Sequence, residues 1–266
     1  MADGLPLIIT AIAGTMSTSS LTYDAMLELL KKQDFEAVSA DSKPQVHSVQ
    51  TVSIASMIGL SCLDDHTQSL IQVMSFLNLE AIPQKILIDN LGRAQLRAFP
   101  KNHGQLNNAQ TKLQQASLIT FNDATQTIGM HRIYQDIVRG SLSPEMRVKV
   151  LVTALEITSG AWVYQPLEHR FNTARYDACS AILPHVDRIY QHYEGMFKSR
   201  MIDASEQAAA LFNDAGWYAV SMPSMLRYRL QTGTGLRDAS RKSRSHFANS
   251  HRAFARHLST PIRARR

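Results

Sequence analysis

Two adjacent carboxylates in the chain could together hold a metal ion. Asp64 and Asp65 follow the mostly apolar run 58–63. Paired acids at the end of an apolar strand hold magnesium in enzymes that also carry a phosphate-binding loop, GxxxxGK[ST]. Neither that loop nor GxGxxG occurs in the 266 residues. The two acids are therefore better explained as caps of the helix that follows them.

His131 is the histidine whose position indicates a contact with an anion. It stands between a predicted strand, 128–130, and a helix predicted to begin at Arg132. The first turn of a helix leaves backbone N–H groups without intrahelical partners, and such groups bind anions. The alternative is a purely structural histidine, which the residue pattern alone favours.

The other histidines and cysteines do not form a recognisable site. His185 and His192 lie seven residues apart on one face of a predicted helix, but two ligands do not make a metal site. Cys62 and Cys179 form no ligand pair, which predicts buried, reduced thiols in a cytoplasmic or nuclear protein. No GxSxG motif marks a nucleophile. The sequence thus predicts that the protein is not an enzyme.

The composition is that of a packed protein with an unevenly distributed charge. Apolar residues make up 44% of the chain and charged residues 19%, unlike a disordered protein. The net charge of +6 arises in residues 227–266, where eleven Lys/Arg stand against one acid. Residues 1–226 carry 17 basic and 21 acidic side chains. Such a basic tail binds nucleic acid nonspecifically, whatever the fold.

No apolar run is long enough for a transmembrane helix. The first run, 5–16, falls short of the roughly 20 residues needed to cross a bilayer. Asp3 precedes it, so it lacks the basic leader of a signal peptide. We therefore expect a cytoplasmic protein that does not bind membranes.

Helical patterns fill most of the chain and surround one β-hairpin. Turn-forming Asn122 and Asp123 separate two short stretches with strand character. Apolar residues at helical spacing predict a buried face on a helix at 67–77. A further helix, 107–117, directly precedes the hairpin. Helices followed by a hairpin are typical of a winged helix, in which 107–117 would be the recognition helix.

The remainder is predicted to be helical up to residue 220. A hydroxyl, a proline and an acid at 143–145 are a strong start signal for a helix to about residue 158. Further helices are predicted at 173–193, with a break at Pro184, and at 204–218. Beyond residue 220 the periodic pattern stops, which predicts a poorly ordered tail.

The side chains of the predicted winged helix argue against recognition of duplex DNA. The recognition helix carries one cation, Lys112, and the wing 119–130 carries none. Binding to DNA phosphates requires several Lys or Arg. Three glutamines of the helix offer amide groups to base edges, so DNA binding is kept as the alternative function. These glutamines are Gln110, Gln114 and Gln115.

Five short motifs follow one another along the chain, at residues 4–7, 70–77, 117–119, 130–135 and 183–186. In this order they resemble the motifs of fungal NB-ARC proteins, which are STAND-class, NLR-like switches with tetratricopeptide repeats. Gly4-Leu5-Pro6-Leu7 resembles the GLPL motif that follows their nucleotide-binding domain. Residues 70–77 resemble the start of their winged helix. Residues 117–119 and 130–135 resemble their paired signature SLI…HRLVQ. Towards the C-terminus, 183–186 and 208–218 resemble elements that lead into the repeats.

The resemblance, which covers about residues 3–220, implies roles for two residues. Pro6 would lie near the adenine of bound ADP, and His131 would reach its β-phosphate and hold a closed, inactive state. The winged helix would act as a regulatory lid. The phosphate-binding loop of the family is not in this sequence, so we expect no cofactor unless a separate nucleotide-binding domain supplies ADP or ATP.

These observations predict a mainly α protein that acts as a regulatory or protein-interaction module without an ATPase site. Its partners would be proteins, among them a full-length NLR-like relative. The alternative is a protein that binds nucleic acid through its winged helix or basic tail. The predicted parts are an ARC-like helical bundle (1–62), the winged helix with its small hairpin (63–141), a TPR-like helical connector (142–220) and a basic tail (221–266).

Overall fold

The computed structural model describes residues 63–165 and 173–231, with side chains up to residue 219, and the isolated residues 13, 14, 16, 22, 24, 25, 28 and 60. The chain divides into two units, 1–153 and 154–266. The predicted helical bundle of residues 1–62, with Pro6, falls almost wholly outside the described residues. The basic tail beyond residue 231 also falls outside them.

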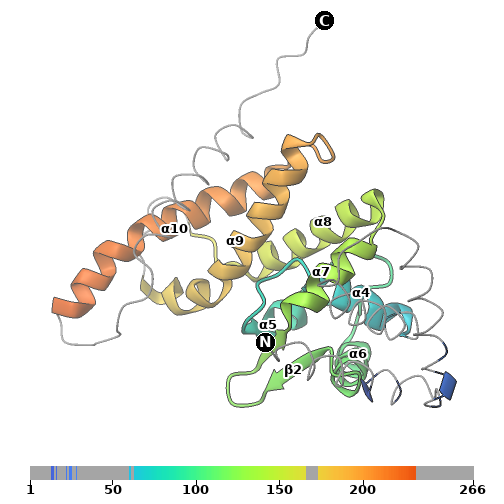
Figure 1. Cartoon of the computed structure of the whole chain (residues 1–266). Coiled ribbons are helices and arrows are strands. Elements are labelled where there is room, and N and C mark those ends of the chain that lie inside the picture. Colours follow the sequence, from blue (N-terminus) through green and yellow to red (C-terminus); the bar gives the residue numbers. More distant parts are fainter. Residues whose placement is uncertain are drawn as a thin grey trace, which may run out of the picture. The chain divides into compact units, whose positions relative to one another are not determined.

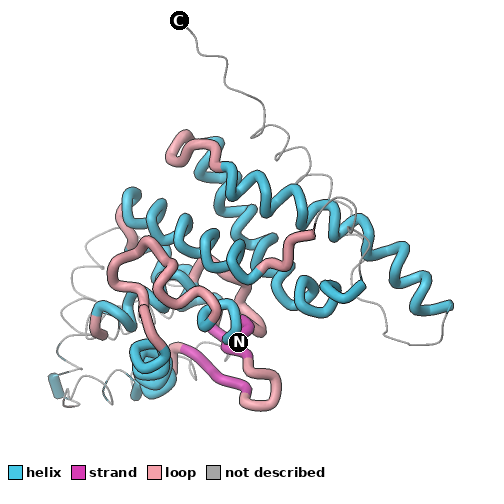
Figure 2. The backbone as a smooth tube through the Cα atoms, turned by 180° about the vertical axis from the view of Figure 1, so that it is seen from behind, coloured by secondary structure: helices cyan, strands magenta, loops and turns pink. Residues whose placement is uncertain are grey.

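The described part is mainly helical with one small antiparallel sheet, which confirms the predicted fold class (Figures 1 and 2). No helix in the described ranges is long and apolar enough to cross a membrane. In chain order the elements are α4 (Asp65–Met74), β1 (Ile82–Pro83), α5 (Gln84–Ile88), α6 (His103–Gln115), β2 (Ile119–Asn122), β3 (Thr127–Met130), α7 (Arg132–Ser141), α8 (Pro144–Ala161), the 3-10 turn η3 (Thr173–Arg175), α9 (Tyr176–Lys198) and α10 (Glu206–Gln231).

Elements α4 to β3 have the order of a winged helix, in which three helices precede a β-hairpin. The hairpin β2–β3 gains a third strand, because β1 pairs with β3 in the sheet order β1-β3-β2. The strands are the magenta segments of Figure 2. Ile128 of β3 pairs with Ile82 on one side and with Phe121 on the other. The sequence prediction of a hairpin alone missed β1, since two residues that end in proline give no alternating pattern.

The predicted apolar face of α4 is the centre of the first core. Leu70, Ile71 and Met74 are at most 1% exposed, and α4 packs against α6 and α7. Carbonyl groups at the end of α4 and just beyond it accept hydrogen bonds from α7. The Gln135 amide donates to the carbonyl oxygens of Met74 and Leu77 at 3.3 and 3.2 Å. These bonds satisfy backbone acceptors that a helix end leaves open.

The start of α4 agrees with the sequence prediction, and the start of α6 does not. Asp64 caps α4 by accepting a hydrogen bond from the backbone N–H of Thr67 at 3.0 Å. The helix predicted at 107–117 begins four residues earlier, at His103, and is capped by Asn102. The Asn102 side chain accepts from the backbone N–H three residues on, which starts the helix before Gly104.

The helices α9 and α10 each contain a proline and continue through it, so the predicted break at Pro184 is wrong. α9 is continuous from Tyr176 to Lys198 with Pro184 inside it. α10 continues beyond Pro223 to Gln231, so regular backbone extends past the predicted end at residue 218. A proline removes one backbone hydrogen bond, which kinks a long helix more readily than it ends it.

Candidate interaction site on the winged helix

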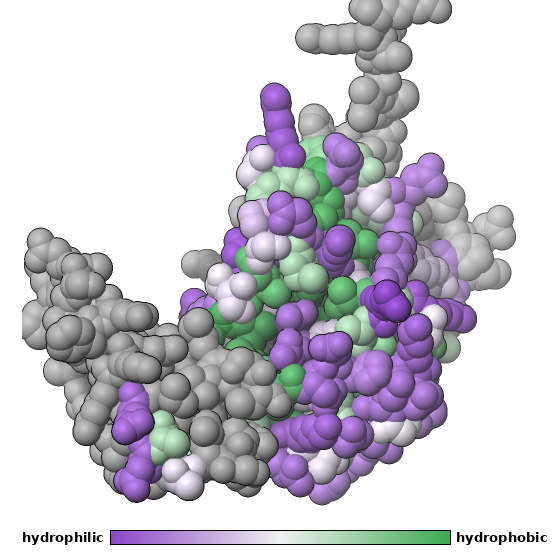
Figure 3. Space-filling view, turned by 90° about the vertical axis from the view of Figure 1, so that its right-hand side faces the viewer, coloured by the Kyte–Doolittle hydropathy of each residue, from purple (hydrophilic) through white to green (hydrophobic). Residues whose placement is uncertain are grey.

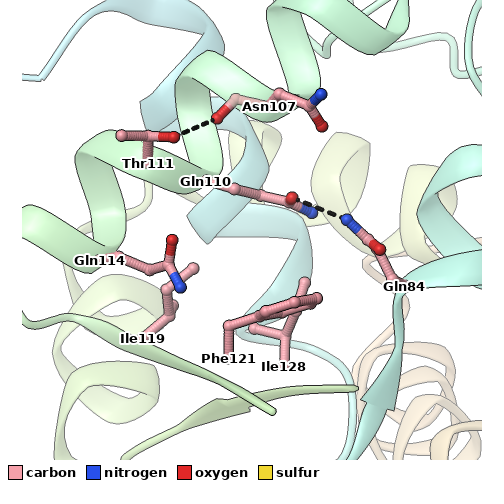
Figure 4. Close-up of a pocket in the computed structure, with 8 residues that line it drawn as sticks. All are labelled: Gln84, Asn107, Gln110, Thr111, Gln114, Ile119, Phe121 and Ile128. Carbon is pink, nitrogen blue, oxygen red and sulfur yellow. Dashed lines mark hydrogen bonds between the residues drawn. The ribbon is translucent and has the colours of Figure 1, made fainter. Parts of the chain in front are cut away.

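The helix α6 faces the sheet with a stripe of uncharged polar side chains. Asn107, Gln110, Thr111 and Gln114 fall at positions i, i+3, i+4 and i+7 of the helix, which lie on one face. A groove of about 290 Å³ lies between this stripe and the sheet (Figure 4). Its remaining lining residues are Gln84, Ile119, Phe121 and Ile128.

Gln110 lies at the centre of the groove wall and is turned inward. Its side chain is 8% exposed, and its Oε1 accepts a hydrogen bond from Nε2 of Gln84 at 3.0 Å (Figure 4). The Nε2 of Gln110 is buried without a hydrogen-bond partner. The sequence analysis gave this glutamine as one that could contact base edges. In the structure its side chain instead points towards the start of α5, where DNA bases do not reach it without rearrangement.

The single Lys or Arg of α6, Lys112, forms an ion pair with Asp64, the residue that caps α4. Lys112 Nζ lies 2.6 Å from Asp64 Oδ2, 48 residues earlier in the chain. Although partial burial opposes the effect, the hydrogen bonds from Lys112 and Thr67 lower the pKa of Asp64 to about 2. The carboxylate is therefore ionised at neutral pH, and it offsets the positive charge that α6 would present to a phosphate.

The outer surface of the winged helix is polar and nearly neutral. Residues 63–141 contain seven Lys/Arg and six Asp/Glu. On the side of the molecule seen in Figure 3, hydrophilic side chains form a broad area at the lower right of the view. Among the described residues, the large apolar side chains with more than a third of their surface exposed all belong to the second unit. They are Val163, Tyr164, Met201 and Trp217.

His131 lies where the sequence places it, at the start of α7, and it caps that helix. Its Nδ1 accepts a hydrogen bond from the backbone N–H of Ile133 at 3.2 Å. The ring also meets Tyr134 edge-on, with centroids 6.2 Å apart. Because Nδ1 is an acceptor, the neutral ring carries its proton on Nε2. The residue is exposed, so this N–H can donate to an external group.

Replacing His131 separates its role as a cap from its role as a donor. His131→Ala removes the acceptor for Ile133 and is expected to lower the free energy of unfolding of the first unit by about 1 kcal/mol. His131→Asp supplies a carboxylate acceptor next to the positive end of α7 and should keep that stability. Urea unfolding followed by circular dichroism measures both. Equal stability of the alanine variant and the wild type would contradict the capping role.

The second unit contains a buried ion pair that no sequence pattern indicated. Arg175 Nη1 lies 2.7 Å from Asp214 Oδ2, and their side chains are 1% and 11% exposed. Trp162 donates to the same carboxylate oxygen at 2.8 Å. Arg175 also lies over the Tyr218 ring, 5.8 Å from its centroid. Trp162 directly follows α8, Arg175 directly precedes α9, and Asp214 and Tyr218 lie in α10, so only a three-dimensional structure reveals that they meet.

The predicted absence of a metal site stays a prediction for the chain as a whole. Within the described ranges, no group of three His, Cys, Asp or Glu side chains comes together. His185 is buried in α9. Cys179 is also buried, as predicted, and burial raises the pKa of its thiol to about 11. A thiol with that pKa is protonated at neutral pH and therefore a poor nucleophile or metal ligand.

Comparison with known proteins identifies one region of the chain. A family model described as a domain of unknown function, DUF7779, matches residues 58–147. The match covers 90 of the 266 residues and extends from before α4 into the start of α8. No curated protein and no solved structure matches the chain. The matched region therefore contains the whole winged helix and leaves out the second unit.

Proposed function

We propose that residues 63–141 are a regulatory winged-helix module of an NLR-like switch protein, which binds protein and does not read duplex DNA. The main support is the outer face of α6. Beyond the first residue of the helix, His103, its exposed side chains are not ionisable, and its one Lys, Lys112, is paired with Asp64. DNA-reading helices need Lys or Arg for phosphates. An uncharged polar face instead suits a protein surface that also lacks strong charge.

The switch needs a nucleotide, ADP or ATP, that this chain does not bind by itself. ADP or ATP would be held by the nucleotide-binding domain of a full-length relative, and the winged helix would close over it. The exposed Nε2–H of His131 supports this idea, because it can donate to a phosphate oxygen. Pro6 remains the second predicted ADP contact. The helical second unit would connect the switch to tetratricopeptide repeats in a cytoplasmic protein.

The test uses the separately produced nucleotide-binding domain of a fungal NLR-like protein, loaded with ADP. Titration calorimetry should show a complex with the full chain, and no binding of ADP to the chain alone. His131→Asp keeps the helix cap but replaces the N–H donor with a negative charge. We expect it to weaken the complex at least about tenfold, since one charge-assisted hydrogen bond is worth that much.

The matched control is His103→Asp, the same exchange at the exposed first residue of α6. It should leave the affinity of the complex unchanged. Tight binding of ADP to the chain alone, or a complex that His131→Asp does not weaken, would refute the proposed role of this histidine.

Nucleic-acid binding is the second candidate, favoured by exposed cations outside α6. Arg93, Arg97 and Lys101 are exposed in the segment between α5 and α6, and residues 227–266 carry eleven Lys/Arg. A chain that ends at Gln231 lacks nine of those eleven. We expect this truncation to abolish binding to duplex DNA in a salt titration. Binding that persists, with a steep dependence on salt concentration, would favour the DNA-reading alternative.

A further inference from the structure

The groove between α6 and the sheet is built unlike an ordinary helix–sheet contact. A helix that packs on a sheet normally presents an apolar stripe to it. Here the sheet side is apolar, with Ile119, Phe121 and Ile128, but the facing stripe of α6 is made of amides and a hydroxyl (Figure 4). The two surfaces do not fill the space between them, which leaves the groove of about 290 Å³.

The groove lacks a hydrogen-bond acceptor for the side-chain amide of Gln110. Its Nε2 is fully buried without an acceptor, while its Oε1 is occupied by Gln84. A buried donor that has lost water and gained no partner destabilises the fold. A carbonyl oxygen that enters the groove would complete the hydrogen bonding of this amide. Gln84, which is half-buried at the start of α5, has to rotate for such an oxygen to reach Nε2.

The charges of the groove restrict what can enter it. None of its eight lining residues is ionisable, and Lys112 on the same helix is held by Asp64. A phosphate or carboxylate would lose its hydration without gaining a cation. The volume is at the small end of ligand pockets, which suits a side chain better than a cofactor. The walls therefore fit an uncharged amide, which both donates and accepts hydrogen bonds.

We propose that this groove receives a glutamine or asparagine side chain from a protein partner of the winged helix. The inserted amide oxygen accepts from Gln110 Nε2, its NH₂ group donates to the amide oxygens of Asn107 or Gln114, and its aliphatic stem lies on Phe121. This inference rests on the proposed function, because it supplies the docking site for the protein contacts proposed there.

The test is an NMR titration of the full chain with the blocked tripeptide acetyl-Leu-Gln-Leu-amide. We expect saturable shifts of the side-chain amide signals of Gln110 and Gln114. The acidic analogue acetyl-Leu-Glu-Leu-amide has nearly the same shape and should bind at least about tenfold more weakly. Absence of saturable shifts, or equal affinity for the two tripeptides, would overturn the inference. Tighter binding of adenosine than of the glutamine tripeptide would overturn it as well.

Variants of α6 localise the binding. Gln110→Leu removes the buried donor and should abolish the titration, while Gln115→Leu, at an exposed position outside the groove lining, should leave it intact. Gln114→Ala keeps the bond between Gln84 and Gln110 and should weaken binding even if the Gln110 variant fails to fold. The titration needs neither nucleotide nor a second domain. A negative result here with an intact ADP-dependent complex would reject the groove and leave the proposed function standing.

Discussion

Asp214→Ala is expected to lower the free energy of unfolding of the second unit by about 3–5 kcal/mol, because it leaves Arg175 charged, buried and without its partner. The substitution also removes the acceptor of the Trp162 indole N–H. The only two tryptophans of the chain, Trp162 and Trp217, both lie in this unit. Urea unfolding followed by tryptophan fluorescence therefore reports on the second unit alone.

Two further variants distinguish the ion pair from general damage. Asp203→Ala removes an exposed acid from the same unit and should change its stability by less than about 0.5 kcal/mol. The double variant Arg175→Met with Asp214→Leu removes both buried charges and should recover most of the lost stability. If Asp214→Ala unfolds at the same urea concentration as the wild type, the ion pair does not hold α9 and α10 together.

Gly14→Ala is expected to destabilise the first unit by about 3 kcal/mol, although alanine favours helix. Gly14 is buried and helical, and a Cβ atom at this position would lie 2.2 Å from the carbonyl oxygen of Ala116, the C-cap of α6. That atom belongs to the backbone, so the segment around Gly14 or the end of α6 has to move. The cost exceeds the roughly 1 kcal/mol that alanine contributes in a helix.

Hydrogen exchange at the end of α6 measures this effect directly. In the Gly14→Ala variant, amides of residues 112–118 should exchange faster than in the wild type, because the contact that covers Ala116 is lost. Gly140→Ala is the matched control, since a Cβ at Gly140 in α7 has nothing within 4 Å. It should raise stability by up to about 1 kcal/mol. Unchanged exchange at α6 in the Gly14 variant would contradict the close approach.

Local sequence signals predicted the elements of the winged helix well and their boundaries less well. The caps Asp64 and His131 and the turn at Asn122 each act on backbone groups within three residues, so the sequence contains the whole interaction. The helix predicted from residue 107 begins earlier, because the cap at Asn102 starts it before Gly104. β1 was missed because its hydrogen bonds depend on a distant strand.

Helical periodicity, caps and turns depend on neighbours along the chain, so the residue pattern was enough to indicate the mainly α fold, the hairpin and the positions of Asp64 and His131. Which side chains are accessible to a ligand or partner depends instead on tertiary packing. It turned Gln110 towards Gln84, 26 residues away, and joined Lys112 to Asp64. It also buried Arg175 against Asp214, 39 residues later. Packing alone sets the distance between residues so far apart in the chain, and that distance determines whether a charge is paired or free to bind.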